Sequence, residues 1–227
     1  MMGVLRMKSD SKKDPFEKRG YIFEVRASHD DKHGDFIEGR PIVYESKTDI
    51  CGWFEETICR GALDHTDLTD VRFLVNHDDS KIPLARSRRN NENSTMQLKV
   101  DENGMWIRVN LDTENNMDAR ALYSAVKRGD ISGMSFLFIV KEQKWEDEDT
   151  EYPKRFITAI SKVVEVSAVN MPAYEDTEIY ARSKEALENA KKALENARNK
   201  KDSVETDGQE RNKVEILKLK NQILGGY

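Results

Sequence analysis

The chain has 227 residues, enough for one sizeable domain or for one domain with an appendage. A net charge of -5 argues against a globally basic nucleic-acid binder, and no apolar run is long enough for a transmembrane helix. The charge is uneven, because residues 20–180 carry -11 whereas residues 1–19 and 181–227 carry +3 each. We therefore predict an acidic core between two basic terminal segments, with no nucleic-acid or membrane partner.

Residues 1–19 are polar and charged, with Pro15 near their end, and they predict a flexible N-terminal arm that can be processed. They lack the apolar stretch of a secretory signal. Cys51 and Cys59 have neither zinc-site spacing nor a second cysteine pair, so we expect free thiols in a reducing compartment, with a disulfide as the alternative. No metal and no cofactor is predicted.

Strand patterns dominate the core. From Tyr21 the hydrophobic residues recur with a period of two, which predicts a first strand, and further strands are predicted over 41–44, 53–58 and 71–75. A hairpin is predicted over 96–111, since apolar residues alternate on both sides of an Asp-Glu-Asn-Gly turn.

A second long hairpin is predicted over 135–169, with an acidic loop at 146–152, and Pro172 ends it. Between the hairpins, an Ala/Leu/Val stripe predicts one helix that begins at Asn115 or Asn116 and stops at Gly129. This pattern predicts a β-rich α+β fold: a small closed or nearly closed β-barrel surrounded by a few helices, with a sandwich as the alternative.

The segment 181–227 has a helical pattern, unlike the strand patterns of the core. Alanines and leucines fall on one helical face over 186–197, a polar linker follows over 199–212, and a short second stripe spans 214–224. This thin stripe predicts a helical C-terminal tail that binds a scaffold or another partner, or else a solvated helix that frays. The predicted domains are thus 1–19 arm, 20–180 β-barrel domain and 181–227 tail.

Three residues of the core suggest chemistry. His77 directly follows the apolar strand 71–75, where a strand end can present an imidazole to a cleft or simply carry a polar residue. Ser135 begins an apolar strand behind Gly133, a pattern that also suits an ordinary strand residue. Glu165 interrupts an apolar strand, so it either faces outward or pairs with a partner such as an imidazole.

Together these three side chains supply a nucleophile, a base and an orienting acid for acyl transfer. The remaining histidines carry weaker signals. His29 and His33 lie in a charged loop that suits solvation better than a metal site, and His65 lies in a short turn or helical segment. From composition and spacing alone, each of these residues can also be an ordinary strand, turn or loop residue without a catalytic or metal-binding role.

An ordered set of motifs resembles the prohead maturation proteases of tailed bacteriophages, which share their fold with the herpesvirus assembly proteases. The resemblance covers about 20–180. The motifs are Gly61-Ala62-Leu63, Asn76-His77-Asp78 after its strand, Leu84-Ala85-Arg86, Gly129 to Phe136, Glu165-Val166-Ser167 and Asn170 to Tyr174.

The resemblance implies a serine endopeptidase, packaged inside the assembling prohead in the host cytoplasm. It would cleave scaffold segments of the major capsid protein and then itself, and it would form a homo-oligomer. Ser135 matches the nucleophile and His77 the general base, and Glu165 is taken as the third member, although the herpesvirus relatives use a second histidine there. Leu137 and Ala85 each replace a glycine of the family pattern.

Two other functional classes are compatible with these residues. A catalytically inactive scaffold or capsid-assembly protein on the same fold would suit the helical tail and the split charge. A plain β-barrel binding module would show neither self-cleavage nor labelling of Ser135. The donors to the oxyanion are left open, with backbone amides near Ser135 or Arg86 as candidates.

Overall fold

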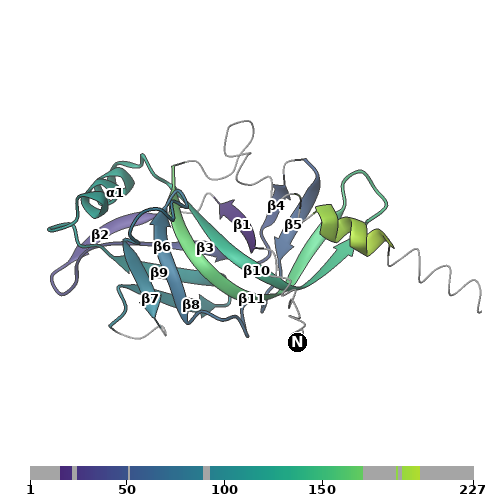
Figure 1. Ribbon diagram of the computed structural model, residues 1–227, viewed down its shortest axis with the longest axis horizontal. Coiled ribbons are helices and arrows are strands. Elements are labelled where there is room, and N and C mark those ends of the chain that lie inside the picture. Colours follow the sequence, from purple (N-terminus) through teal and green to yellow (C-terminus); the bar gives the residue numbers. More distant parts are fainter. Residues whose placement is uncertain are drawn as a thin grey trace, which may run out of the picture.

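The computed structural model describes residues 16–21, 25–50, 52–88, 93–170, 188 and 191–199. These residues form eleven strands and the helix α1 (Met117–Arg128), and residues 191–199 are also helical (Figure 1). The strands are β1 (Phe16–Tyr21), β2 (Arg26–Asp30), β3 (Gly34–Val43), β4 (Lys47–Ile50), β5 (Phe54–Ile58), β6 (Asp70–Val75), β7 (Ala85–Arg88), β8 (Met96–Asp101), β9 (Gly104–Asn110), β10 (Gly133–Glu146) and β11 (Lys154–Val169).

The strands are arranged in two sheets. The larger has the order β1-β10-β11-β5-β4, with β6 on β11 and β7 on β6, and the smaller has the order β2-β3-β9-β8. The long strand β11 pairs with β10 along one edge. Its other edge is shared, because β5 pairs in parallel with Lys154–Ile157 and β6 pairs in parallel with Glu165–Ala168. β11 therefore holds three separate parts of the chain together.

The hydrophobic core contains residues from both sheets and from α1. Alternation along β10 buries Met134, Phe136 and Phe138 in this core. On β11, Val166 and Ala168 are buried there in the same way, so Ser135 and Glu165 lie on the opposite face of their strands. The alternation that builds the core thus places these polar side chains together.

The helix α1 lies against β2 and β3 at one end of the molecule (Figure 1). Its N-cap is Asn116, whose side chain accepts hydrogen bonds from the N–H groups of Asp118 and Ala119. Gly129, at φ 81°, ends it in the left-handed conformation that glycine adopts at low cost. The predicted helix is confirmed, with Asn116 rather than Asn115 as its cap.

The two sheets contain the predicted hairpins but do not form the predicted closed barrel. The two hairpins are confirmed as β8–β9 and β10–β11, and the fold is β-rich. The closed barrel is wrong, since the strands of the described residues form two separate sheets. Periodicity shows which face of a strand is buried but not which edges pair, so the branching at β11 could not be foreseen.

The N-terminal arm is shorter than predicted. Residues 16–19 belong to β1, which pairs with β10, so the predicted boundary at residue 19 falls inside a strand. Residues 1–15 and 22–24 lie outside the described residues, as does Cys51, whereas Cys59 is a free thiol.

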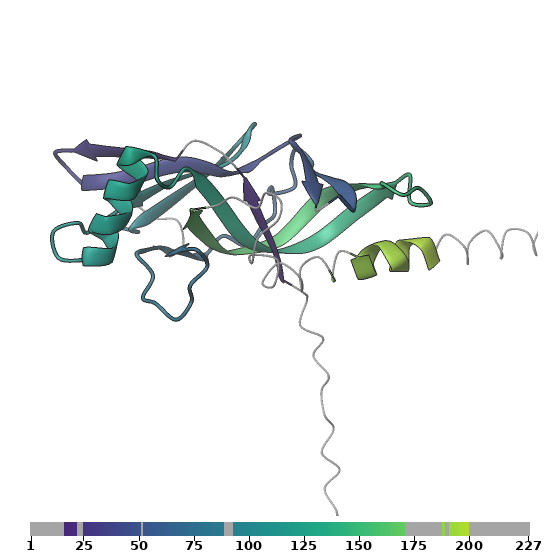
Figure 2. The ribbon, with the colours of Figure 1, turned by 90° about the horizontal axis from the view of Figure 1, so that it is seen from above.

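Part of the tail contacts the core. The guanidinium Nε of Arg198 donates to the Glu148 carbonyl at 2.6 Å, and Lys191 Nζ lies 3.3 Å from the ring centre of Trp53. Helix 191–199 therefore lies beside the loop of the β10–β11 hairpin, at the end opposite to α1 (Figure 2). The predicted stripe over 214–224 lies outside the described residues. Across the described ranges, no helix is both long and apolar enough to cross a membrane.

Candidate active site

Three neighbouring strands of the larger sheet carry the candidate residues. Ser135 on β10 lies opposite Ser167 on β11, and Glu165 is two residues earlier on β11, on the same face. β6 pairs with β11 on its other edge, and His77 follows β6 after one intervening residue. The sheet thus brings together residues that are up to 88 positions apart in the sequence.

The turn that carries His77 has an unusual backbone. Asn76 and His77 have φ values of 52° and 57°, in the left-handed region that non-glycine residues seldom adopt. The N–H of Asn76 donates to the Ala168 carbonyl at 2.9 Å, and the N–H of Asn170 donates to Asn76 Oδ1 at 3.2 Å. These bonds to the end of β11 hold the turn in its strained conformation.

The side chains form a continuous hydrogen-bonded chain. His77 Nε2 lies 2.6 Å from Ser135 Oγ, and His77 Nδ1 lies 2.7 Å from Glu165 Oε1. An ionised carboxylate only accepts hydrogen bonds, so Nδ1 carries a proton and the neutral ring presents its Nε2 lone pair to the serine. The structure thus brings His77, Ser135 and Glu165 together, with the imidazole between the hydroxyl and the carboxylate.

Ser167 joins this chain, a contribution that sequence reasoning missed. Its hydroxyl donates to Glu165 Oε1 at 2.5 Å and accepts from the backbone N–H of His77 at 3.1 Å. The residue is completely buried. The signal was available in the spacing, because Glu165 and Ser167 are two apart on one strand and so share a face.

Glu165 is a carboxyl group that is only 2% exposed. Burial raises the pKa of this carboxyl, but hydrogen bonds from His77 and Ser167 outweigh burial, and its pKa is lowered below the ordinary glutamate value. A buried carboxylate next to an imidazole can fix the orientation of the ring and stabilise its protonated form. The arrangement is therefore suited to moving a proton between Ser135 and His77.

The other titratable candidates are engaged elsewhere. His29 Nδ1 pairs with Asp35 at 2.9 Å, and His33 Nδ1 pairs with Asp30 at 3.2 Å, so the two rings bind different carboxylates. His65 is exposed. Arg86, a candidate oxyanion donor, binds Asp70 through Nε at 2.5 Å and Nη2 at 2.6 Å, so its guanidinium already has a bidentate partner.

The N-terminal strand also reaches the nucleophile. β1 pairs with β10 on the side away from β11, and Ser135 Oγ lies 2.7 Å from the Arg19 carbonyl oxygen, within hydrogen-bond distance. A serine has one hydroxyl proton, and a neutral His77 ring with its proton on Nδ1 can only accept at Nε2. The hydroxyl therefore donates either to Nε2 or to this carbonyl.

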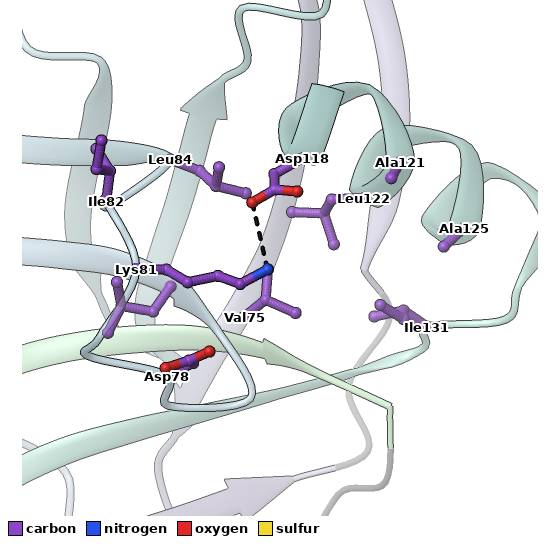
Figure 3. A pocket seen from close by; sticks show the side chains of 11 residues that line it. Val75, Asp78, Lys81, Ile82, Leu84, Asp118, Ala121, Leu122, Ala125 and Ile131 are labelled. Atoms are coloured by element: carbon purple, nitrogen blue, oxygen red, sulfur yellow. Dashed lines mark hydrogen bonds and ion pairs between the residues drawn. The ribbon is translucent and has the colours of Figure 1, made fainter. Parts of the chain in front are cut away.

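A separate pocket of about 280 Å³ lies between α1 and the loop that follows β6 (Figure 3). Its walls are mainly apolar, and Lys81 Nζ and Asp118 Oδ2 face each other across it at 3.3 Å. Val75, two residues before His77, and Asp78, directly after it, belong to its lining. His77, Ser135 and Glu165 do not line it, so this pocket is distinct from the hydrogen-bonded chain.

Comparison with known proteins gives one family and one similar solved structure. Residues 22–193 match the family model described as caudovirus prohead serine protease. No curated protein matches the chain. Among solved structures, the capsid assembly protease of bacteriophage T4 is similar, with 13% identity, 67% of this chain and 98% of that chain covered, and a TM-score of 0.33. Because the family model spans well over half of the sequence, the chain belongs to the caudovirus prohead serine protease family.

Proposed function

We propose that this protein is an active serine endopeptidase that matures a phage prohead. The observation that carries the proposal is the unbroken chain from Ser135 through His77 to Glu165, with contacts of 2.6 and 2.7 Å. Family membership gives the reaction class, and this geometry supplies a group for each role.

In the proposed mechanism, Ser135 Oγ attacks a peptide carbonyl carbon while His77 Nε2 takes the hydroxyl proton. His77 then gives that proton to the leaving amine, and a water molecule repeats the sequence to release the acyl group. Glu165 holds the ring through Nδ1 and stabilises the imidazolium, and Ser167 holds Glu165. Backbone N–H groups near Ser135 would bind the oxyanion, since Arg86 is paired with Asp70.

The proposed substrates are scaffold segments of the major capsid protein and the protease itself. The enzyme would act inside the assembling prohead, in the host cytoplasm, as a homo-oligomer. Residues 20–180 would perform the chemistry, and the helical segment after about residue 181 would bind a scaffold or another copy. Kinship in fold with the herpesvirus assembly proteases belongs to the same proposal.

The test compares the wild type with Ser135→Ala, using Ser132→Ala as a control, because Ser132 is exposed and three residues away. The purified chains are incubated with the capsid protein precursor and analysed by mass spectrometry. We expect Ser135→Ala to lower the cleavage rate by several orders of magnitude and Ser132→Ala to leave it nearly unchanged. Normal processing by folded Ser135→Ala would end the protease proposal. A wild type that neither cleaves nor reacts with a fluorophosphonate at Ser135 would be an inactive scaffold protein.

A further inference from the structure

The strand β1 occupies the edge of the larger sheet, beside the proposed nucleophile. It pairs antiparallel with β10 from Phe16, opposite Ile139, to Tyr21, opposite Met134. Gly20 lies opposite Ser135, and the preceding carbonyl, that of Arg19, accepts the Ser135 hydroxyl at 2.7 Å. An extended segment bound to a sheet edge through its main chain is a common form of peptide recognition.

Two side chains of β1 enter a buried charged site. The Glu17 carboxylate binds the Arg155 guanidinium through two contacts of 2.6 and 2.7 Å. The Arg19 guanidinium binds Glu56 through Nε and, at 2.7 Å, through Nη2. Glu17, Arg19, Glu56 and Arg155 are all at most 6% exposed. Ion pairs so deeply buried are costly unless the geometry is good, so the site is built to accept these charges.

The buried charged site accepts the two charges of β1 in one order only. Without β1, its fixed part is Arg155 and Glu56, which contact each other at 2.9 Å, and Gln143, which accepts from Arg155 Nε at 2.7 Å. Arg155 faces the position of Glu17, and Glu56 faces the position of Arg19. A strand with the two charges exchanged would place like charges together in a buried site, which is strongly unfavourable. The site therefore distinguishes an acidic residue followed two positions later by a basic one from the reverse order.

We infer that β1 is the chain's own substrate segment, that Ser135 cleaves the bond between Arg19 and Gly20, and that Glu56 and Arg155 determine specificity for peptides with this acidic-x-basic pattern. This inference rests on the proposed function, since it requires a reactive Ser135. It adds the substrate class and the residues that select it.

The reaction is a peptide hydrolysis. Ser135 Oγ forms an ester with the Arg19 carbonyl carbon, the Arg19–Gly20 bond breaks, and the Gly20 nitrogen leaves as an amine with the proton from His77. Water then hydrolyses the ester, which gives a carboxylate on Arg19 and restores Ser135. Departure of residues 1–19 frees the edge of β10 and the charged site for peptides supplied by another molecule.

The first experiment follows the full-length chain by intact-mass spectrometry and N-terminal sequencing. The matched pair is Arg19→Gln and Lys18→Gln, because these neighbours differ in whether their side chain enters the charged site. We expect the wild type and Lys18→Gln to yield a chain that begins at Gly20, and Ser135→Ala to stay intact. Arg19→Gln should cleave there at least about 100-fold more slowly, because Glu56 loses its ion pair with Arg19 and keeps only its contact with Arg155. Equal cleavage of Arg19→Gln and Lys18→Gln would overturn the inference.

The second experiment uses added peptides, so it does not depend on the stability of β1 variants. The processed chain is given Phe-Glu-Lys-Arg-Gly-Tyr or the exchanged Phe-Arg-Lys-Glu-Gly-Tyr, each with capped ends, and kcat/KM is measured. The first peptide should be preferred by at least about 100-fold. Glu56→Gln should abolish this preference, while Glu55→Gln, on the half-buried neighbour, should keep it. Equal kcat/KM values for the two peptides, or a preference that survives in Glu56→Gln, would refute the assignment of the site.

The two proposals fail in different ways. If the four charged side chains only fasten β1 to the sheet, the capsid precursor is cleaved and Ser135 is labelled, yet the Arg19–Gly20 bond stays intact. That result would overturn the present inference and leave the protease proposal standing. If Ser135 is unreactive toward every substrate and probe, the protease proposal fails first.

Discussion

The hydroxyl of Ser167 is the least obvious contributor to the candidate site. It lies between two groups that must keep their positions, the Glu165 carboxylate and the backbone N–H of His77. It thereby links the strand that carries the acid to the strained turn that carries the base. These two contacts give the hydroxyl a positioning role.

We predict that Ser167→Ala destabilises the fold and slows the reaction. Removal of the hydroxyl leaves the His77 N–H without its partner and Glu165 with one donor fewer, which costs about 1–3 kcal/mol. Ser87→Ala is the matched control, because Ser87 is equally buried but its hydroxyl has no hydrogen-bond partner among the described residues. Urea unfolding should show the loss for Ser167→Ala alone, and kcat should fall more than KM changes. Equal unfolding midpoints for the two variants would show that Ser167 has no positioning role.

A second prediction concerns Glu165 and pH. Glu165→Gln keeps the shape of the side chain but removes its charge, so kcat should fall by about two to four orders of magnitude with the fold intact. Because its pKa is lowered, wild-type Glu165 keeps its charge at a lower pH than an ordinary glutamate. The carboxylate should therefore keep its charge on the acid side of the pH profile, where protonation of the general base already stops the reaction.

The pH profile of kcat/KM measures this directly. Its logarithm should fall with a slope of one on the acid side, where a slope of two would mean that the carboxylate titrates as well. Full activity of Glu165→Gln would move the search for the third group to Asp78, the residue after His77.

At the scale of the element, β1 is held by charges that respond to acid. Burial raises the pKa of Glu17, but hydrogen bonds and ion pairs with Arg155 and Arg19 outweigh burial, so its pKa is lowered from 4.5. A carboxyl with a lowered pKa in the folded state stabilises the fold above its unfolded-state pKa. That contribution is lost as the pH falls through the folded-state pKa.

We predict that this stabilisation is visible when cleavage is prevented. In the Ser135→Ala background, Glu17→Gln should lower the free energy of unfolding at pH 7 by about 3 kcal/mol, because a buried pair is broken. The difference between the two proteins should shrink as the pH falls below the ordinary glutamate range. Urea midpoints measured at several pH values test this, and a difference independent of pH would contradict it.

Sequence patterns predicted elements better than their partners. The two hairpins and α1 could be read because their turns and caps are local, as with Asn116 and Gly129. The position of β1 could not be predicted in this way. Glu17 and Arg19 resemble residues of a solvated arm, because their partners Arg155 and Glu56 lie far away in the sequence. Ser135, His77 and Glu165 were found through the family motifs, since each alone was compatible with an ordinary strand residue.

At the scale of the whole molecule, the last strand of the described core ends at Val169, the predicted boundary at residue 180 lies outside the described residues, and part of the tail contacts the core. Arg198 and Lys191 contact the far end of the β10–β11 hairpin, away from α1. Between the described residues, these polar contacts at partly buried side chains contribute little to the stability of the core. The tail is therefore expected to serve assembly rather than folding.

A shortened chain of residues 16–180 tests whether the core folds without the tail and whether the tail is needed for assembly. It begins at Phe16 because β1 belongs to the larger sheet. We expect it to fold and to cleave an added peptide, but to fail to enter assembling capsids. Circular dichroism, peptide cleavage and co-assembly with the capsid protein are the measurements. Loss of the folded core, or unchanged incorporation into capsids, would show that the tail has a different role.

The branched pairing of β11 also has a consequence for the time at which activity can arise. His77 and Ser135 emerge early from the ribosome, but the strand that orders them, and carries Glu165 and Ser167, is the last strand of the described core. At translation rates of 5–20 residues per second, Ser167 follows Ser135 by roughly 2–6 s. During that interval the nascent chain has the proposed nucleophile and the proposed base but no assembled site. A protease built in this order cannot cut itself, or its neighbours, before its own core has been synthesised.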